Sequence, residues 1–130
     1  MKFSITSDSS CFCEADPVRL GQAVTIVMEN ALRYAAEGGE LTALARKTPT
    51  GCELVFCDRG PGVPADFLPV MFERFTRAES SRARHSGGSG LGLSIARGIC
   101  IAHGGSIHAT PGKDQGLVIT ITLPVGNIRA

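Results

Sequence analysis

Residues 85–97 read HSGGSGLGLSIAR, which puts four glycines into six residues directly before an apolar pattern of helical period. Glycine loses more backbone freedom on folding than any other residue, so such a cluster needs a reason. Glycine-rich backbone before a helix can point its amides at a phosphate, and the helix N-terminus adds positive potential. The stretch therefore predicts a phosphate-binding loop that leads into a helix over 90–103.

The spacing of these glycines fits neither of two common phosphate-binding motifs. A P-loop has a lysine and then a serine or threonine after its last glycine, where Leu93 and Ser94 stand here, and a dinucleotide fingerprint fails at the same positions. The preceding segment TRAESSRARHSGG (76–88) carries three arginines and no large apolar side chain. It indicates a mobile basic loop, with an ordinary solvated surface loop as the alternative.

The pattern of the remaining chain predicts a mixed α/β fold. A helix is expected from Asp16-Pro17, a cap followed by a first-turn proline, to Gly38-Gly39. The helix over 90–103 carries Leu91, Ile95, Ile99 and Ala102 on its apolar side. Strands are expected near 2–13 (one or two), 40–47, 52–57, 106–110 and 117–123, with one or two short helices in 65–75. We expect a two-layer sandwich in which a mixed, largely antiparallel sheet of about five strands is covered on one face by about three helices.

Composition excludes several classes of protein. The chain has 130 residues, enough for one domain with one core. The net charge of +1 provides no global field for nucleic acid or an anionic membrane, and no apolar run approaches the roughly 20 residues of a membrane span. The five cysteines are odd in number, and the spacing of Cys11 and Cys13 lacks the two-residue gap of common zinc or redox motifs, so buried free thiols in a reducing compartment are favoured over a metal pair.

Two further segments carry chemistry. The strand ELVFCD ends in Asp58, whose carboxylate can accept an N–H from a flat heterocycle, while the glycines of RGPG let backbone approach the ring; the alternative is a plain tight turn. On the first helix, Ile26, Asn30 and Arg33 share one ridge. Asn30 offers an oxygen suited to Mg²⁺, Arg33 can meet phosphate oxygens and Tyr34 can line a base pocket, unless this ridge is a solvent-facing stripe.

In this order the segments resemble the N, G1, F and G2 boxes of the ATP-binding domain of sensor histidine kinases, the fold shared with DNA gyrase, Hsp90 and MutL. The boxes look like MENALRYA (28–35), DRGPG (58–62), FERF (72–75) and GGSGLGLSIA (87–96). The resemblance covers residues 14–124, so the chain 1–130 is expected to be a single domain of this type.

The resemblance implies an ATP lid over 76–90 that closes on the triphosphate, supported by Phe72 and Phe75. It implies that Asp58 holds the adenine amino group, that Asn30 holds Mg²⁺ and acts with Arg33 in catalysis, and that Gly60 and Gly62 give the ring clearance. The whole set of expected nucleotide contacts is Asn30, Arg33, Tyr34, Asp58, Gly60, Gly62, Val63, Phe75, Arg82, Arg84, Gly88, Gly90, Leu91, Gly92 and Leu93.

The implied function is binding of Mg-ATP and transfer of its γ-phosphoryl group to a histidine on a separate dimerisation domain, with a response regulator downstream. His85, His103 and His108 lack the family's acceptor context, an acidic residue followed by Leu-Arg, so the acceptor domain is expected outside this chain. His103 is expected to pack at a helix end. A cytoplasmic location is expected, either alone or as part of a membrane-anchored sensor, with no nucleic acid partner and no membrane contact by this domain.

Two other readings stay open. A serine kinase of the anti-sigma-factor type uses the same fold at this length. A pseudokinase is motivated by Ile26, because the family commonly has Asn one turn before the metal-binding Asn. A gyrase or Hsp90 type ATPase is disfavoured, since no transducer domain follows residue 130. Leu117 is a second departure, because the family often has a nucleotide-serving Thr after Gly116, and this leaves that contact open.

Overall fold

The computed structural model of the chain describes residues 2–7, 15–35, 40–58, 65–73, 92–112 and 116–124. In chain order its elements are β1 (Lys2–Ser7), α1 (Pro17–Ala35), β2 (Glu40–Thr48), β3 (Gly51–Asp58), the 3₁₀ helix η1 (Leu68–Val70), α2 (Gly92–Ala102), β4 (Ser106–Pro111) and β5 (Leu117–Pro124). Every described strand and α-helix lies where the sequence pattern predicts one.

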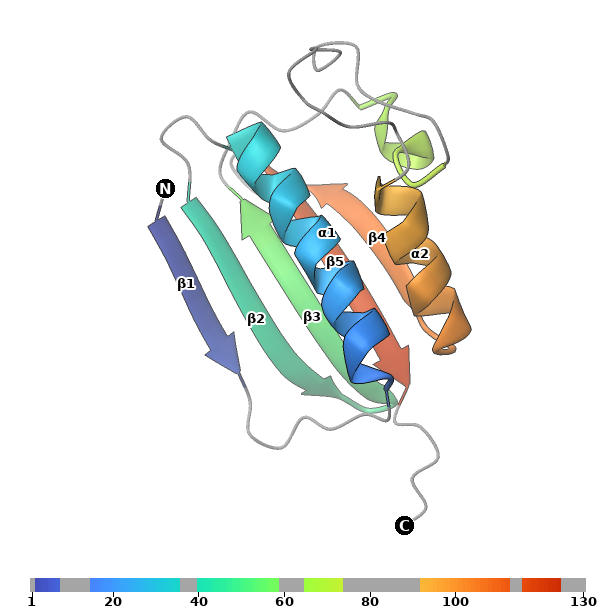
Figure 1. Cartoon of the computed structure of the whole chain (residues 1–130). Helices are drawn as coiled ribbons and strands as arrows, with labels where there is room; N and C mark the ends of the chain where they lie inside the picture. The colour runs from blue at the N-terminus through green and yellow to red at the C-terminus, as the bar shows by residue number, and fades with distance from the viewer. Residues whose placement is uncertain are drawn as a thin grey trace.

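The strands form one sheet of five in the order β1-β2-β3-β5-β4. β1 runs parallel to β2, and every other neighbouring pair is antiparallel. Figure 1 shows α1 and α2 side by side over the same face of this sheet. The α/β fold and the mixed, largely antiparallel sheet are therefore confirmed.

The helical layer is smaller than expected, because the described residues contain two α-helices and one 3₁₀ helix of three residues. In η1, Val70 N–H donates to the Phe67 carbonyl at 3.0 Å, and Glu73 N–H donates to the Val70 carbonyl at 3.0 Å. Pro69 has no backbone N–H and cannot add a bond to a longer α-helix at this point. The third helix is thereby reduced to a tight turn.

The core lies between the sheet and the two helices. Along β5 every second residue is buried, and these residues are Leu117, Ile119, Ile121 and Leu123. Such alternation places one face of a strand against a covering layer. The helices contribute Ala23, Val27, Ala31, Ala96, Ile99 and Cys100.

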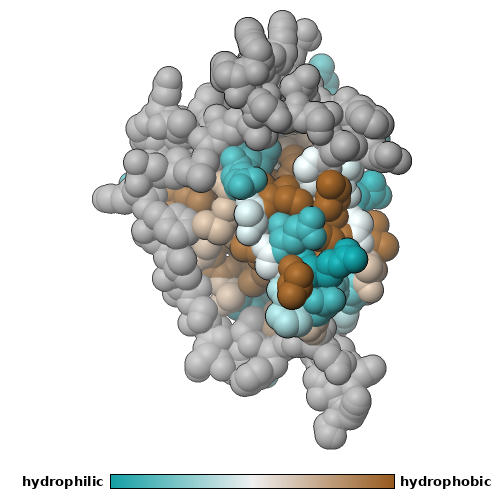
Figure 2. Space-filling model, viewed as in Figure 1, coloured by the Kyte–Doolittle hydropathy of each residue, from teal (hydrophilic) through white to brown (hydrophobic). Residues whose placement is uncertain are grey.

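The side of α2 that faces the core differs from the side that the sequence pattern predicts. Ala96, Ile99 and Cys100 are buried, whereas Ile95 is 43% exposed and Ala102 is exposed; Leu91 lies outside the described residues. The sequence GLSIARGICIA is apolar almost all round, so its pattern does not mark one face. Figure 2 shows apolar and hydrophilic residues interspersed on the helix-covered side of the molecule.

The two helices are joined at one end through the side chain of His103. Asp16 caps α1, since its Oδ1 accepts from the amides of Val18 at 3.0 Å and Arg19 at 3.2 Å. Its own amide donates to Nε2 of His103 at 3.0 Å, and Nδ1 of His103 lies 2.8 Å from the Ile99 carbonyl. The neutral ring with its proton on Nδ1 satisfies both partners. His103 therefore sits at a helix end, as predicted, and connects the start of α1 to the end of α2.

Cys52 and Cys100 are buried cysteines outside any disulfide, as the sequence predicts, and Cys57 is half-buried and also outside any disulfide. Burial raises the pKa of the Cys100 thiol to about 11. Cys11 and Cys13 lie outside the described residues. None of the helices in the described part of the chain has the length and apolar character that crossing a bilayer requires.

Candidate nucleotide-binding site

The candidate site lies at the end of the sheet where β3 stops and β5 starts. Asp58 is the last residue of β3 and Leu117 is the first residue of β5. The pairing of Cys57 with Val118 makes Asp58 and Leu117 the next opposite pair in the register. In Figure 1 this end of the sheet also carries the C-terminal half of α1 and the N-terminus of α2. Four segments that are distant in sequence therefore converge here.

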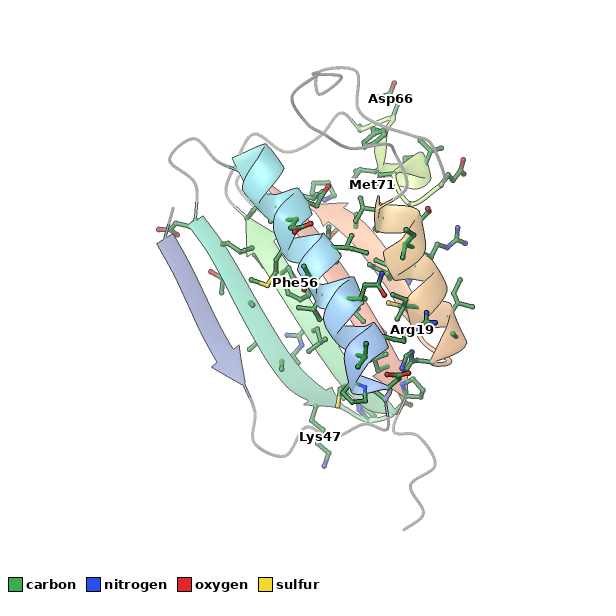
Figure 3. The ribbon with its side chains drawn as sticks, in the orientation of Figure 1. Arg19, Lys47, Phe56, Asp66 and Met71 are labelled. Atoms are coloured by element: carbon green, nitrogen blue, oxygen red, sulfur yellow. The ribbon has the colours of Figure 1, made fainter. Side chains whose placement is uncertain are left out.

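Asp58 is buried at this end, with 5% of its surface exposed. Phe56, labelled in Figure 3, is buried in the core below the helices, and strand alternation places Asp58 on the same face two residues later. Oδ1 of Asp58 accepts a hydrogen bond from the Leu117 backbone N–H at 3.3 Å. The carboxylate thus points into the layer between sheet and helices, which a plain surface turn does not require.

The pKa of the Cys57 thiol is raised, and the carboxylate of Asp58 is one of the causes. Burial and, second, the negative charge of Asp58 raise the pKa of Cys57 above its ordinary value, while Arg46 opposes the shift. A buried carboxylate at a strand end can accept a hydrogen bond from an amino group, and being acceptor-only it selects for donors.

Asn30 is the second buried polar side chain, with 6% of its surface exposed. Its Nδ2 has no hydrogen-bond partner among the described residues. Buried polar atoms are nearly always paired, so an orphan in a native fold indicates a missing ligand, ion or water. A half turn of the amide exchanges its nitrogen and oxygen, so the group fits either a phosphate oxygen or Mg²⁺. At Ile26 and Asn30 the interpretation of this ridge as a solvent-facing stripe is therefore wrong.

Ile26 lies one turn before Asn30 and packs at the junction of the two helices. It is half-buried against the core, and a Cβ built on Gly92 would lie 3.6 Å from its Cγ2. Leu93 is also half-buried against the core, so its side chain is committed to packing. The ridge of α1 therefore faces the first turn of α2, where backbone N–H groups and the helix dipole favour anions.

The structure tests only part of the predicted site. Arg33 and Tyr34 lie in α1, but the structure does not describe their side chains. The other expected contacts lie outside the described residues: Gly60, Gly62, Val63, Phe75, Arg82, Arg84, Gly88, Gly90, Leu91 and the lid 76–90. Their roles stay predictions. Among the described positions, Asn30, Asp58, Gly92 and Leu93 come from three elements whose ends meet at one end of the fold.

Sequence reasoning missed the part played by the main chain of β5. Leu117 attracted attention only for its side chain, whereas its backbone N–H contacts Asp58. The available signal was Gly116, a glycine directly before a strand, which has a φ of +94°.

A separate pocket of about 580 Å³ lies between η1, α2 and β4, and Phe72, Arg97 and Ile107 are among the residues that line it. It contains neither Asp58 nor Asn30.

Comparison with known proteins places the chain in a family. Residues 15–127 match the family of histidine kinase-, DNA gyrase B- and HSP90-like ATPases, and the chain belongs to this family. It is 42% identical over 125 residues to the signal transduction histidine-protein kinase BaeS of Escherichia coli (strain K12), an alignment that covers 96% of this chain and 26% of BaeS. The chain thus spans about a quarter of the length of that curated relative.

Solved structures agree with this assignment. The mycobacterial sensor histidine kinase MprB matches with a TM-score of 0.82 and 33% identity, over 95% of this chain and 82% of that one. Histidine kinase ThkA in complex with the response regulator protein TrrA matches with a TM-score of 0.75 and 25% identity, over 95% of this chain and 34% of that one.

Proposed function

We propose that this chain is the ATP-binding catalytic domain of a sensor histidine kinase, which donates the γ-phosphoryl group of Mg-ATP to a histidine on a separate dimerisation domain. The observation that carries the proposal is that the two polar side chains buried among the described residues, Asp58 and Asn30, belong to the last residue of β3 and to the C-terminal half of α1, two elements that Figure 1 shows meeting at the end of the sheet where α2 begins. The membership in an ATPase family and the similarity to sensor histidine kinases support it.

Each described group has a role in this proposal. Asp58, held by the Leu117 N–H, accepts a hydrogen bond from the amino group of adenine. Asn30 turns its amide oxygen toward Mg²⁺, or its nitrogen toward a phosphate oxygen. The N-terminus of α2, at Gly92, provides positive potential for the phosphates.

The chemistry is mainly one of positioning. Bound Mg²⁺ supplies charge neutralisation at the β- and γ-phosphates. Ile26 on α1 and Leu93 on α2 both pack against the core, and this packing anchors the polyphosphate end of the proposed site. Arg33 and the lid arginines Arg82 and Arg84 are proposed to contact phosphate oxygens. No general base is assigned to this chain, because the acceptor histidine belongs to the other domain.

The partners follow from the same proposal. The chain acts on the dimerisation domain of the same kinase, and a response regulator receives the phosphoryl group next; the ThkA–TrrA complex shows such a pair for a relative. Its place is the cytoplasmic part of the kinase. The anti-sigma-factor type of serine kinase receives no support from relatives named as sensor histidine kinases. Ile26 is half-buried and packs against the core, which gives this residue a structural role in an active domain as well as in a pseudokinase.

The test is phosphotransfer in two parts. The isolated chain, incubated with γ-labelled ATP and Mg²⁺, is expected to remain unlabelled, because none of its histidines has an acceptor context. Addition of a dimerisation domain from the parent kinase should then give acid-labile label on that domain alone. Stable label on His85, His103 or His108, or calorimetry that shows no nucleotide binding, would refute the proposal.

A further inference from the structure

The carboxylate of Asp58 is held by the main chain of the neighbouring strand. The Leu117 N–H donates to Oδ1 of Asp58 at 3.3 Å, and both residues are buried. A backbone donor at the start of a strand is fixed by the sheet, whereas a side-chain donor can rotate. The orientation of Asp58 is therefore determined partly by the peptide group that joins Gly116 to Leu117.

That peptide group is fixed at both ends. The Gly116 carbonyl accepts a hydrogen bond from the Gly112 N–H at 3.0 Å, on the β4 side. In a trans peptide the carbonyl and the following N–H point in opposite directions, so the Leu117 N–H is directed to the β3 side, where Asp58 lies. This arrangement depends on Gly116, whose φ of +94° is a conformation that residues with a Cβ rarely adopt.

We propose that Gly116 is a positioning residue for base selection: its backbone conformation directs the Leu117 N–H onto Asp58 and so fixes the edge that the carboxylate presents to the base. The inference rests on the proposed function, because it assumes that the base of the nucleotide meets Asp58. It assigns to the β4–β5 turn a role that neither the Asp58 side chain nor the glycine-rich stretch at 87–92 fulfils.

The consequence concerns adenine against guanine. The adenine edge presents a 6-amino donor, whereas guanine has a carbonyl at that position and donors at N1 and N2. A carboxylate that is free to turn can present both oxygens to the two guanine donors. A carboxylate held at Oδ1 keeps one orientation, which suits the adenine amino group and faces the guanine carbonyl with like partial charge.

The test uses two glycines with matched backbone conformations. Gly116 has a φ of +94°, and Gly104, after the end of α2, has a φ of +79°. A Cβ on Gly104 would meet Pro124 Cγ at an ordinary 3.5 Å, so Gly104→Ala adds backbone strain away from Asp58. Dissociation constants for ATP and GTP with Mg²⁺ are measured by calorimetry for the wild-type chain, Gly116→Ala, Gly116→Asn and Gly104→Ala, together with thermal unfolding.

We expect Gly116→Ala to weaken ATP binding by about tenfold, or about 1.4 kcal/mol, with little change for GTP, so that the ATP/GTP preference falls by the same factor. Gly116→Asn should recover part of that preference, since Asn tolerates positive φ. Gly104→Ala should lower the melting temperature and leave the preference unchanged. An unchanged preference in a folded Gly116→Ala chain, or equal effects at both glycines, would overturn the inference.

If Gly116→Ala does not fold, hydrogen exchange tests whether Asp58 holds the Leu117 N–H. The Leu117 amide of the wild-type chain should exchange slowly and should exchange faster in Asp58→Ala, whereas unaltered exchange would show that Asp58 does not hold it. This measurement needs no nucleotide, so it separates the inference from the proposed function. A wild-type chain that binds no nucleotide refutes the proposed function, while a chain that binds ATP and GTP equally refutes base selection by this turn.

Discussion

Replacement of Asn30 by leucine should stabilise the protein and remove its response to Mg²⁺. Asn30 is 94% buried, since only 6% of its surface is exposed, and its Nδ2 has no partner among the described residues. A buried polar group without a partner costs about 1–3 kcal/mol. Leucine has nearly the same shape and has no polar atom, so Asn30→Leu recovers that cost in the nucleotide-free protein.

The size of the effect on melting temperature follows from the length of the chain. A chain of 130 residues unfolds with an entropy near 0.27 kcal/mol/K, at about 2.1 cal/mol/K per residue. A gain of about 1–3 kcal/mol therefore raises the melting temperature by about 4–11 °C. Better helix propensity of leucine adds a few tenths of a kcal/mol. Thr25→Leu, at an exposed position on the same helix, measures that smaller contribution alone.

The assay combines thermal unfolding with titration of ATP at increasing Mg²⁺. Asn30→Leu should melt higher than Thr25→Leu, and the dependence of its ATP affinity on Mg²⁺ should disappear. Asn30→Asp, which buries an unpaired charge, should melt lower than the wild-type chain without ligand. The reasoning is refuted if Asn30→Leu lowers the melting temperature, because the amide would then be satisfied in the free protein, or if Mg²⁺ dependence survives it.

Three further predictions test the site, the helix junction and a buried thiol. Asp58→Asn should weaken ATP binding by about 1.5–3 kcal/mol in calorimetry, the scale of a hydrogen bond to a charged group, while Asp66→Asn, at an exposed position next to η1 (Figure 3), should leave the affinity unchanged. If Asp58→Asn binds ATP as tightly as the wild-type chain, Asp58 does not belong to the site. His103→Ala deletes the bonds to Asp16 and to the Ile99 carbonyl, so the free energy of unfolding should fall by about 1–3 kcal/mol with ATP affinity retained, and a loss of affinity would contradict its placement away from the site. Burial raises the pKa of Cys100 from 9.0 to about 11, so the stability that the neutral thiol contributes is complete below pH 9 and is lost as pH rises toward 11. In chemical denaturation between about pH 8 and pH 11, the free energy of unfolding should therefore decline less in Cys100→Ala than in the wild-type chain, and an equal decline in both would contradict the shift.

The strands and the long helix could be predicted because local signals mark them. Asp16 and Pro17 announce the start of α1, and the structure shows the Asp16 cap with two amides bound to its carboxylate. The alternation in LVITITL is that of a strand with one covered face, and β5 shows it in its burial. These signals depend on residues that are close in sequence.

Which side of α2 is buried, and the short length of the third helix, depend on tertiary packing and could not be predicted from the local sequence. Ile95, Ile99 and Ile101 are spread around α2, so the buried side is chosen by the fit of Ala96 and Cys100 into the core. In η1 the short span is fixed where Pro69 interrupts the backbone donors. Helical periodicity is informative when one face is polar, and α2 has no such face.

The candidate site divides in the same way. Candidate residues could be named from the sequence because carboxylate, amide and glycine have distinctive chemistry, and the structure buries Asp58 at the end of β3 and Asn30 in the C-terminal half of α1. What the sequence conceals is the support behind them. Every residue except proline has a backbone N–H, so the sequence does not mark the hydrogen bond from the Leu117 N–H to Asp58. This bond can be found only when β5 is placed beside β3. The side chain at a position such as Leu117 therefore says little about a site whose contact there is made by the main chain, and the Leu117 N–H holds Asp58 whatever that side chain contributes to the nucleotide.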